Sequence, residues 1–186
     1  MRALADRDRI ARFMRRLGAA SDADTRVYLT GGATAVLYGW RDSTIDVDIR
    51  VLPERDAIYR AIPALKEELQ INVELASPDQ FIPVKDGWEG RSPFVVREGR
   101  VSFHHFDLYA QALAKIERGH TLDVADVGEM LSRRLIERDA LLAYYEAIAP
   151  RLYRYPAVDA ASFAAAVQAV AVSPPSPESP ATPKVS

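Results

Sequence analysis

The sequence predicts a mixed α/β (α+β) domain followed by a helical extension. Residues 44–50 (TIDVDIR) and 71–75 (INVEL) alternate polar and apolar side chains with the period of a strand. A helix-like segment separates them, and only helix-like segments follow residue 107. We therefore expect a core domain over residues 1–120, a helical region over 121–172 and a disordered Pro/Ser-rich tail over 173–186.

Composition limits the class of protein. The chain has 186 residues, no cysteine and a net charge of −2. Without cysteine it forms no disulfide and no thiolate site, so we expect a cytoplasmic protein. No apolar run approaches the roughly 20 residues of a membrane span, and we expect no membrane partner. The charge provides no general attraction to nucleic acid, although Arg12, Arg15 and Arg16 could form a local basic patch.

The first expected elements are a helix and a buried strand. Apolar residues in 10–17 recur every three or four positions and predict a helix that ends near residue 18. Residues 27–30 (VYLT) predict a short buried strand. Gly31-Gly32 breaks this strand in a turn, and residues 33–38 predict about two helical turns.

The TIDVDIR strand carries two candidate site residues. Its alternation predicts that Ile45, Val47 and Ile49 face a core, so that Asp46 and Asp48 share the opposite face. Two carboxylates on one face repel each other unless a cation lies between them. The pair is therefore a candidate site for a hard metal ion.

The spacing of this pair is not specific by itself. The same Asp-x-Asp spacing occurs in residues 6–8 and 22–24, which we expect on the surface or in a loop. An exposed strand face compensated by Arg41 and Arg50 is the alternative interpretation. Glu74, on the polar face of the INVEL strand, adds a third acid, and such a set can hold two divalent ions in phosphoryl transfer. A solvated strand residue is its alternative.

The glycine pair supplies a second candidate feature. Between a strand and a helix, Gly31 and Gly32 let backbone N–H groups approach a phosphate at the helix N-terminus. Thr30 or Thr34 would add a hydroxyl. Thirteen residues separate Gly32 from Asp46, which is enough for a helix and a return loop.

The middle of the chain predicts a crossover helix and a hairpin. Residues 54–69 are helix-like but contain Pro63, which either kinks the helix or begins a second one. Residues 94–97 and 100–106 predict a hairpin, with Gly99 supplying a positive φ in its turn.

Aspartates open the expected C-terminal helices. Asp107 is expected to cap a helix that ends near residue 118. Further helices are expected at 123–133, 139–149 and 159–172, each with its first aspartate as N-cap. The Pro/Ser-rich segment 173–186 cannot bury a core.

The segment TGGATAVLYGWRDSTIDVDIRV (30–51) resembles the hallmark of the DNA polymerase beta-like nucleotidyltransferases, a Gly-Gly or Gly-Ser turn followed by Asp-x-Asp. NVELASPDQF (72–81) resembles the segment that carries their third carboxylate. The pattern is similar to the small prokaryotic branch of minimal nucleotidyltransferase antitoxins and AbiEii-type toxins, in which a helical lysine precedes Asp-x-x-Asp, like Lys115 and residues 123–126 here. The resemblance implies a nucleotidyltransferase fold, with a mixed β-sheet flanked by helices.

This resemblance implies a reaction and a site. The reaction is transfer of a nucleoside monophosphate from a nucleoside triphosphate to a hydroxyl of a tRNA, a protein or a small molecule, with Mg²⁺ or Mn²⁺ as cofactor. Glu74 would complete the metal site or activate the acceptor. The implied residues are Thr30, Gly31, Gly32 and Lys115 for the phosphates, Asp46, Asp48 and Glu74 for the metal ions, and Asp123 and Asp126 in support.

Two departures from the pattern motivate an alternative. Gly32 stands where many active relatives have serine, and Leu122 stands where toxin-like relatives tend to have a basic residue. The alternative is a degenerate nucleotidyltransferase fold that acts as an antitoxin-like or regulatory binding module, with a cognate toxin or antitoxin as partner. Nucleic-acid binding through the arginine patch, without chemistry, is a third hypothesis.

Overall fold

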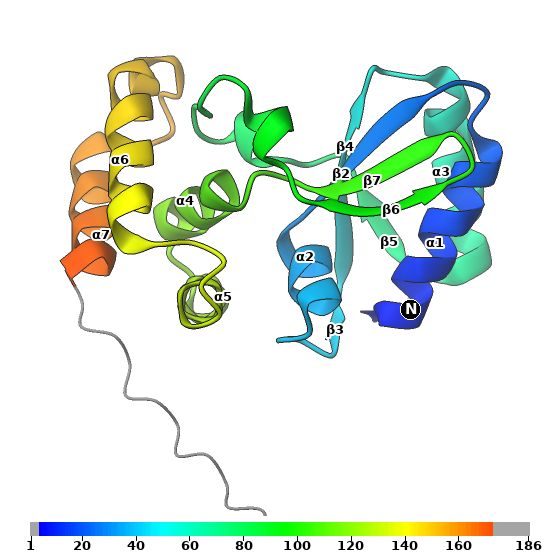
Figure 1. Ribbon diagram of the computed structural model, residues 1–186, viewed down its shortest axis with the longest axis horizontal. Coiled ribbons are helices and arrows are strands. Elements are labelled where there is room, and N and C mark those ends of the chain that lie inside the picture. Colours follow the sequence, from blue (N-terminus) through cyan, green and yellow to red (C-terminus); the bar gives the residue numbers. More distant parts are fainter. Residues whose placement is uncertain (1–3, 173–186) are drawn as a thin grey trace, which may run out of the picture.

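The computed structural model describes residues 4–172, and these form a mixed α/β structure (Figure 1). The fold class expected from the sequence is thereby confirmed. The segment 173–186, expected to be a disordered tail, lies outside the described residues. None of the helices in 4–172 is long and apolar enough to cross a membrane.

The strands are β1 (Ala5–Asp6), β2 (Thr25–Thr30), β3 (Ser43–Thr44), β4 (Asp46–Leu52), β5 (Asn72–Glu74), β6 (Phe94–Glu98) and β7 (Val101–His105). The α-helices are α1 (Arg7–Ala20), α2 (Gly31–Tyr38), α3 (Asp56–Leu69), α4 (Leu108–Arg118), α5 (Thr121–Ser132), α6 (Arg138–Ile148) and α7 (Ala160–Val172). Three short 3₁₀ helices are η1 (Pro78–Gln80), η2 (Trp88–Arg91) and η3 (Ala149–Arg154).

The central sheet has the strand order β5-β4-β2-β7-β6. Strand β2 is antiparallel to β4 and parallel to β7, and β4 is parallel to β5. β6 and β7 form the expected antiparallel hairpin, in which Gly99 has a φ of +54°. Strands β1 and β3 form a separate antiparallel pair, and β3 directly precedes β4 in the chain.

The two faces of the sheet are covered differently. Val47, Ile49 and Val51 are buried with apolar side chains of α1 and α3, which cover one face. Asp46 and Asp48 lie on the other face, as expected from the alternation. The prediction that Ile45 faces the core was wrong, because Ile45 is 70% exposed. Strand β4 begins only at Asp46, so Ile45 lies outside the paired part of the strand.

The structure places the glycine pair differently than expected and decides between the two alternatives for Pro63. Gly31 and Gly32 are the first two residues of α2, rather than a turn that precedes it. Pro63 lies inside α3, which continues as one helix, so no second helix begins there.

Two of the expected aspartate caps were also wrong. His120 and Glu137 are the N-cap residues of α5 and α6, and Asp123 instead lies in the first turn of α5, where it pairs with Arg118. Asp159 does accept the Ser162 N–H, at 2.7 Å, at the start of α7. Charge-assisted hydrogen bonds from Lys115 and Arg118 engage the Asp123 carboxylate, so it does not cap the helix.

Helices α4 to α7 form a second apolar cluster beside the sheet. This cluster includes Leu113, Tyr145 and Phe163 and extends to Tyr28 of β2 and Trp88 of η2. In Figure 1, α6 and α7 lie at the end of the molecule away from the sheet, and α4 lies between them and the strands.

Asp107 anchors α4 at the end of β7. Its Oδ1 accepts the Tyr109 N–H at 3.0 Å, which confirms the expected cap. Its Oδ2 accepts from Arg91 at 2.8 Å and from the Tyr144 hydroxyl at 3.2 Å. These bonds join three elements and fix the position at which α4 leaves the sheet.

Helix α1 passes so close to the β6–β7 turn that only glycine fits. A Cβ on Gly18 would lie 2.3 Å from the Glu98 carbonyl oxygen, whereas a Cβ on Gly128, in α5, would meet nothing within 4 Å.

We expect Gly18→Ala to lower the free energy of unfolding by about 1–3 kcal/mol. Gly128→Ala is the matched control and should raise it by about 0.5–1 kcal/mol. Urea denaturation measures both, and equal effects would contradict this packing.

Candidate functional site

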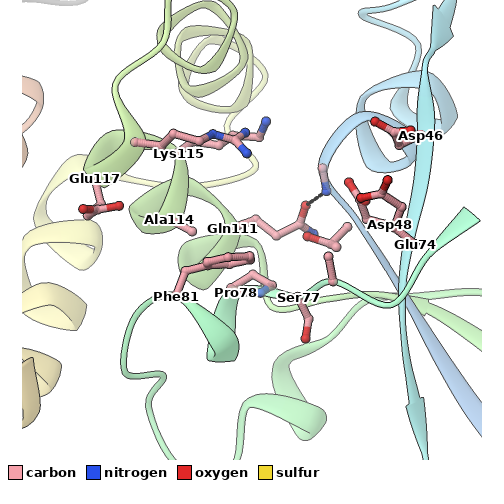
Figure 2. Close-up of a pocket in the computed structure, with 14 residues that line it drawn as sticks. Asp46, Asp48, Glu74, Ser77, Pro78, Phe81, Gln111, Ala114, Lys115 and Glu117 are labelled. Carbon is pink, nitrogen blue, oxygen red and sulfur yellow. Dashed lines mark hydrogen bonds between the residues drawn. The ribbon is translucent and has the colours of Figure 1, made fainter. Parts of the chain in front are cut away.

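The strand register places the candidate acids side by side. Thr30 of β2 is paired with Asp48 of β4, and Asp48 is paired with Glu74 of β5. Asp46 is paired with Asn72 in the adjacent row. Paired residues on neighbouring strands point to the same face of a sheet. Figure 2 shows the three carboxylates gathered on one side of a cavity, as the sequence predicts for Asp46, Asp48 and Glu74.

These carboxylates form a strongly negative wall. Burial, followed by the charges of Asp46 and Glu74, raises the pKa of Asp48 to about 6, although Arg118 and Lys115 act in the opposite direction. Asn72 Nδ2 donates to Asp46 Oδ1 at 2.6 Å and to Glu74 Oε1 at 3.0 Å. No group of three or more His, Cys, Asp or Glu side chains within residues 4–172 has the geometry to hold a metal ion.

The glycine pair allows two side chains to approach the start of α2. Gly31 has a φ of +60°, and a Cβ there would lie 2.8 Å from Asp48 Oδ2. A Cβ on Gly32 would lie 1.9 Å from Thr44 Oγ1. Gly31 lines the cavity, whereas Gly32 is buried beneath Thr44. No serine fits at position 32 unless Thr44 moves, which is a steric reason for glycine at this position.

The Gly31 N–H has a protein partner. It donates to Gln111 Oε1 of α4 at 2.9 Å (Figure 2). Gln111 is buried and lines the cavity next to Thr30 and Gly31. Sequence patterns did not single out Gln111, because a glutamine inside a helix carries no motif of its own.

The opposite wall of the cavity carries the candidate lysine. Lys115 is buried, and its Nζ donates to Asp123 Oδ1 at 3.2 Å and to Asp126 Oδ2 at 2.6 Å. Both aspartates are themselves almost fully buried. Buried charges of this kind require partners, and the two aspartates hold Lys115 at the cavity from behind. The structure thus brings together the three residues of the later motif.

Two arginines complete this network, and sequence reasoning missed the part they play. Arg118 donates to Asp123 through Nε at 2.7 Å and through a terminal nitrogen at 2.6 Å. Arg41 donates through Nε to Asp126 Oδ1 at 2.9 Å, beside Trp40 Nε1 at 3.0 Å. Three cations against two carboxylates leave one excess positive charge. Burial raises the pKa of Asp123, but the hydrogen bond from Arg118 and the charge of Lys115 outweigh it and lower this pKa.

The cavity between the walls has a volume of about 290 Å³. Its acidic side consists of Asp46, Asp48 and Glu74, and α4 contributes the cations Lys115 and Arg118 together with the carboxylate Glu117. An apolar part includes the following residues of η1, its flanks and α4: Ala76, Pro78, Phe81 and Ala114. Phe81 is 55% exposed, so an aromatic face is accessible beside the charged walls. Such a cavity suits a ligand with both anionic and aromatic parts.

Six of the residues expected from the sequence line this one cavity, and the other three do not. The six are Thr30, Gly31, Asp46, Asp48, Glu74 and Lys115. Asp123 and Asp126 lie behind Lys115, and Gly32 lies under Thr44. Arg118 follows Lys115 by three residues, and this helical spacing is the signal that could have found it. The chemical role of each of these nine residues remains a prediction.

The arginine patch lies apart from this cavity. Arg12, Arg15 and Arg16 belong to α1, which covers the sheet face opposite to the acids. Arg16 is paired with Glu68 of α3 at 2.8 Å. The patch therefore makes no contact with the acidic or basic wall.

Comparisons with known proteins found no match. No protein-family model, no curated protein and no solved structure matches this chain.

The raised pKa of Asp48 predicts that ionisation of this carboxyl lowers the free energy of unfolding as the pH rises. The protonated form is favoured in the folded state, so its contribution to stability is complete below pH 4 and is lost as the pH rises through about 6. In the absence of divalent ions, we expect Asp48→Asn to stabilise the protein by about 2 kcal/mol at pH 7.5. Denaturation between pH 4 and 8 measures this gain. An equal gain at pH 4 and pH 7.5 would show that ionisation of Asp48 is not its cause.

Proposed function

We propose that the protein is a metal-dependent nucleotidyltransferase, which transfers a nucleoside monophosphate from a nucleoside triphosphate to an acceptor hydroxyl. The observation that carries the proposal is the cavity in which three carboxylates face Lys115 and Arg118. A triphosphate with bound divalent ions carries both signs of charge and complements both walls.

The order of elements supports a nucleotidyltransferase fold. A strand ends at Thr30, a helix begins at the glycine pair, and the next strand of the central sheet carries Asp46 and Asp48. Glu74 follows on a strand parallel and adjacent to β4. This order of motifs along the chain is the one implied by the resemblance, and it supports the proposal.

The carboxylates have the ligand chemistry for Mg²⁺ or Mn²⁺, and binding would require them to move from the described arrangement, in which no three acids are placed to hold a metal ion. Hard divalent cations prefer oxygen ligands, and Asp46, Asp48 and Glu74 offer only oxygens. A bound cation would relieve the repulsion that raises the pKa of Asp48. It would compete with the Asn72 amide for oxygens of Asp46 and Glu74. When bound, the metal ions would neutralise charge on the attacking and leaving oxygens.

Individual residues have separate roles in the proposed nucleotidyl transfer. Lys115 and Arg118 bind the phosphates, and Phe81 offers a ring for the base. The acceptor oxygen bonds to the α-phosphorus, the bond from this phosphorus to the β-phosphate bridging oxygen breaks, and pyrophosphate leaves. The hydroxyl proton passes to Glu74 or Asp48. Positioning and charge neutralisation supply most of the rate.

The acceptor is a hydroxyl of a tRNA, a protein or a small molecule. The resemblance to toxin and antitoxin nucleotidyltransferases adds a cognate toxin or antitoxin as a proposed partner. Incubation with labelled nucleoside triphosphates, Mg²⁺ or Mn²⁺ and a cell extract would identify the acceptor, because the label marks the product.

Asp46→Asn is the first test of the proposal. We expect this change to lower transfer by on the order of 100-fold or more, because it removes a carboxylate of the metal site. Asp22→Asn is the matched control, since Asp22 is an exposed member of another Asp-x-Asp pair. The measurement is incorporation of labelled nucleotide at saturating Mg²⁺. Equal activity of Asp46→Asn and the wild type would contradict the assignment.

A specific observation also favours the binding-module alternative. The Gly31 N–H already donates to Gln111, and Gly32 does not line the cavity. Calorimetry with a nucleoside triphosphate and Mg²⁺ separates the hypotheses. Metal-dependent binding without transfer to any acceptor would favour the module, and binding with transfer that requires Asp46 would favour the enzyme.

Arg118→Gln tests the basic wall. We expect about a 10-fold increase in the KM for the nucleotide, with kcat within about threefold, because the arginine contributes charge-assisted hydrogen bonds to phosphate. Arg97→Gln is the control, because Arg97 is an exposed arginine paired with Asp24 outside the cavity. Steady-state kinetics measures both variants. A fall in kcat with unchanged KM would assign Arg118 another role.

A further inference from the structure

The hydrogen bonds of Gln111 join α4 to the start of α2. Its Oε1 accepts the Gly31 N–H at 2.9 Å, and its Nε2 donates to Phe106 O at 2.8 Å and to Thr34 Oγ1 at 3.2 Å. The side chain is only 2% exposed. A flipped amide would set its NH₂ against the Gly31 N–H and its oxygen against the Phe106 carbonyl. The partners therefore fix one orientation of the amide.

Gln111 is coupled to Asp48 through Gly31. The Cβ position of Gly31 lies 2.8 Å from Asp48 Oδ2, so the Gly31 backbone packs directly against this carboxylate. Any shift of that backbone changes the space in which Asp48 lies. The hydrogen bond from Gly31 to Gln111 therefore restrains a wall of the Asp48 site.

Gln111 also shares a face of α4 with the cations. Lys115 and Arg118 follow it by four and seven residues, which places all three on one side of the helix. Both cations are held by Asp123, and this pairing does not involve Gln111. The Gln111 side chain thus reaches from α4, which carries the basic wall, to the start of α2, where it accepts the Gly31 N–H (Figure 2).

We propose that Gln111 is a positioning residue, which holds Asp48 and the cations of α4 in register across the cavity. This inference rests on the proposed function, because the register matters only if both walls act on one substrate. Gln111 acts through Gly31 and takes no part in the transfer itself.

The chain offers a selective probe of this contact. Thr30-Gly31 is the only Thr-Gly pair in the sequence, so ¹³C-carbonyl threonine with ¹⁵N-glycine labels the Gly31 amide alone in a carbonyl-filtered NMR spectrum. Titration with Mg²⁺ should shift this resonance, because Gly31 packs against Asp48. The titration gives a Kd for Mg²⁺ that does not depend on catalytic activity.

Gln111→Met retains the length of the side chain and removes its hydrogen bonds. We expect the Gly31 resonance to move, and the Kd for Mg²⁺ to rise about 10-fold, as for other changes behind a metal ligand. At saturating Mg²⁺, kcat should fall by about 100-fold through misplacement. The KM for the nucleotide should stay within about threefold, because Asp123 still holds Lys115 and Arg118.

Two further variants separate positioning from stability. Thr34→Val removes one partner of Gln111, keeps the shape of the core, and should give smaller changes of the same sign. Gly18→Ala disturbs the contact between α1 and the β6–β7 turn, and Gly18 does not line the cavity. We expect Gly18→Ala to lower the melting temperature without changing the Kd for Mg²⁺ or kcat.

The outcomes distinguish this inference from the proposed function. If wild-type Gly31 does not respond to Mg²⁺ and no transfer occurs, both are overturned. If the wild type binds Mg²⁺ and transfers nucleotide, but Gln111→Met matches it in Kd and kcat, the inference alone is overturned. The same holds if Gly18→Ala weakens Mg²⁺ binding as much as Gln111→Met, since a general loss of stability would then explain both.

Discussion

The register of β4 between β2 and β5 is the constraint on which the candidate site depends. Because side chains alternate along a strand, a slip by one residue would turn Asp46 and Asp48 into the apolar core and expose Val47 and Ile49. Burial of these apolar side chains against α1 and α3 keeps the carboxylates on the cavity side. The core thereby holds Asp48 in a partly buried position beside two other carboxylates, and burial followed by the charges of Asp46 and Glu74 raises the pKa of Asp48 to about 6.

The basic wall is the counterpart of this cluster. Lys115 is buried on α4, and it remains compatible with that position because Asp123 and Asp126 accept its hydrogen bonds. Arg41 and Arg118 in turn bind the same two aspartates, and Lys115 and Arg118 are the cations of this network that line the cavity. Opposite charges on two walls would orient a triphosphate and its metal ions before any chemistry, which is the basis of the proposed function.

The glycine pair connects the two walls by steric means. Gly31 gives Asp48 Oδ2 the room that a side chain would fill, and Gly32 does the same for Thr44. Gln111 then takes the Gly31 N–H. In this chain the close approach of neighbouring side chains accounts for both glycines. A role in phosphate binding is an additional proposal, which would require the Gly31 N–H to leave Gln111.

The sequence by itself determined the elements whose signals are local. Strand alternation placed Asp46 and Asp48 on one face, the turn glycine predicted the β6–β7 hairpin, and the acids of β4 and β5 were expected together. Only the tertiary structure decided that Ile45 is exposed, that Asp123 binds Lys115 and Arg118 instead of capping α5, and that Gln111 meets Gly31. These outcomes depend on long polar side chains that reach across the fold and on where strand pairing begins, and neither follows from the periodicity of a single segment.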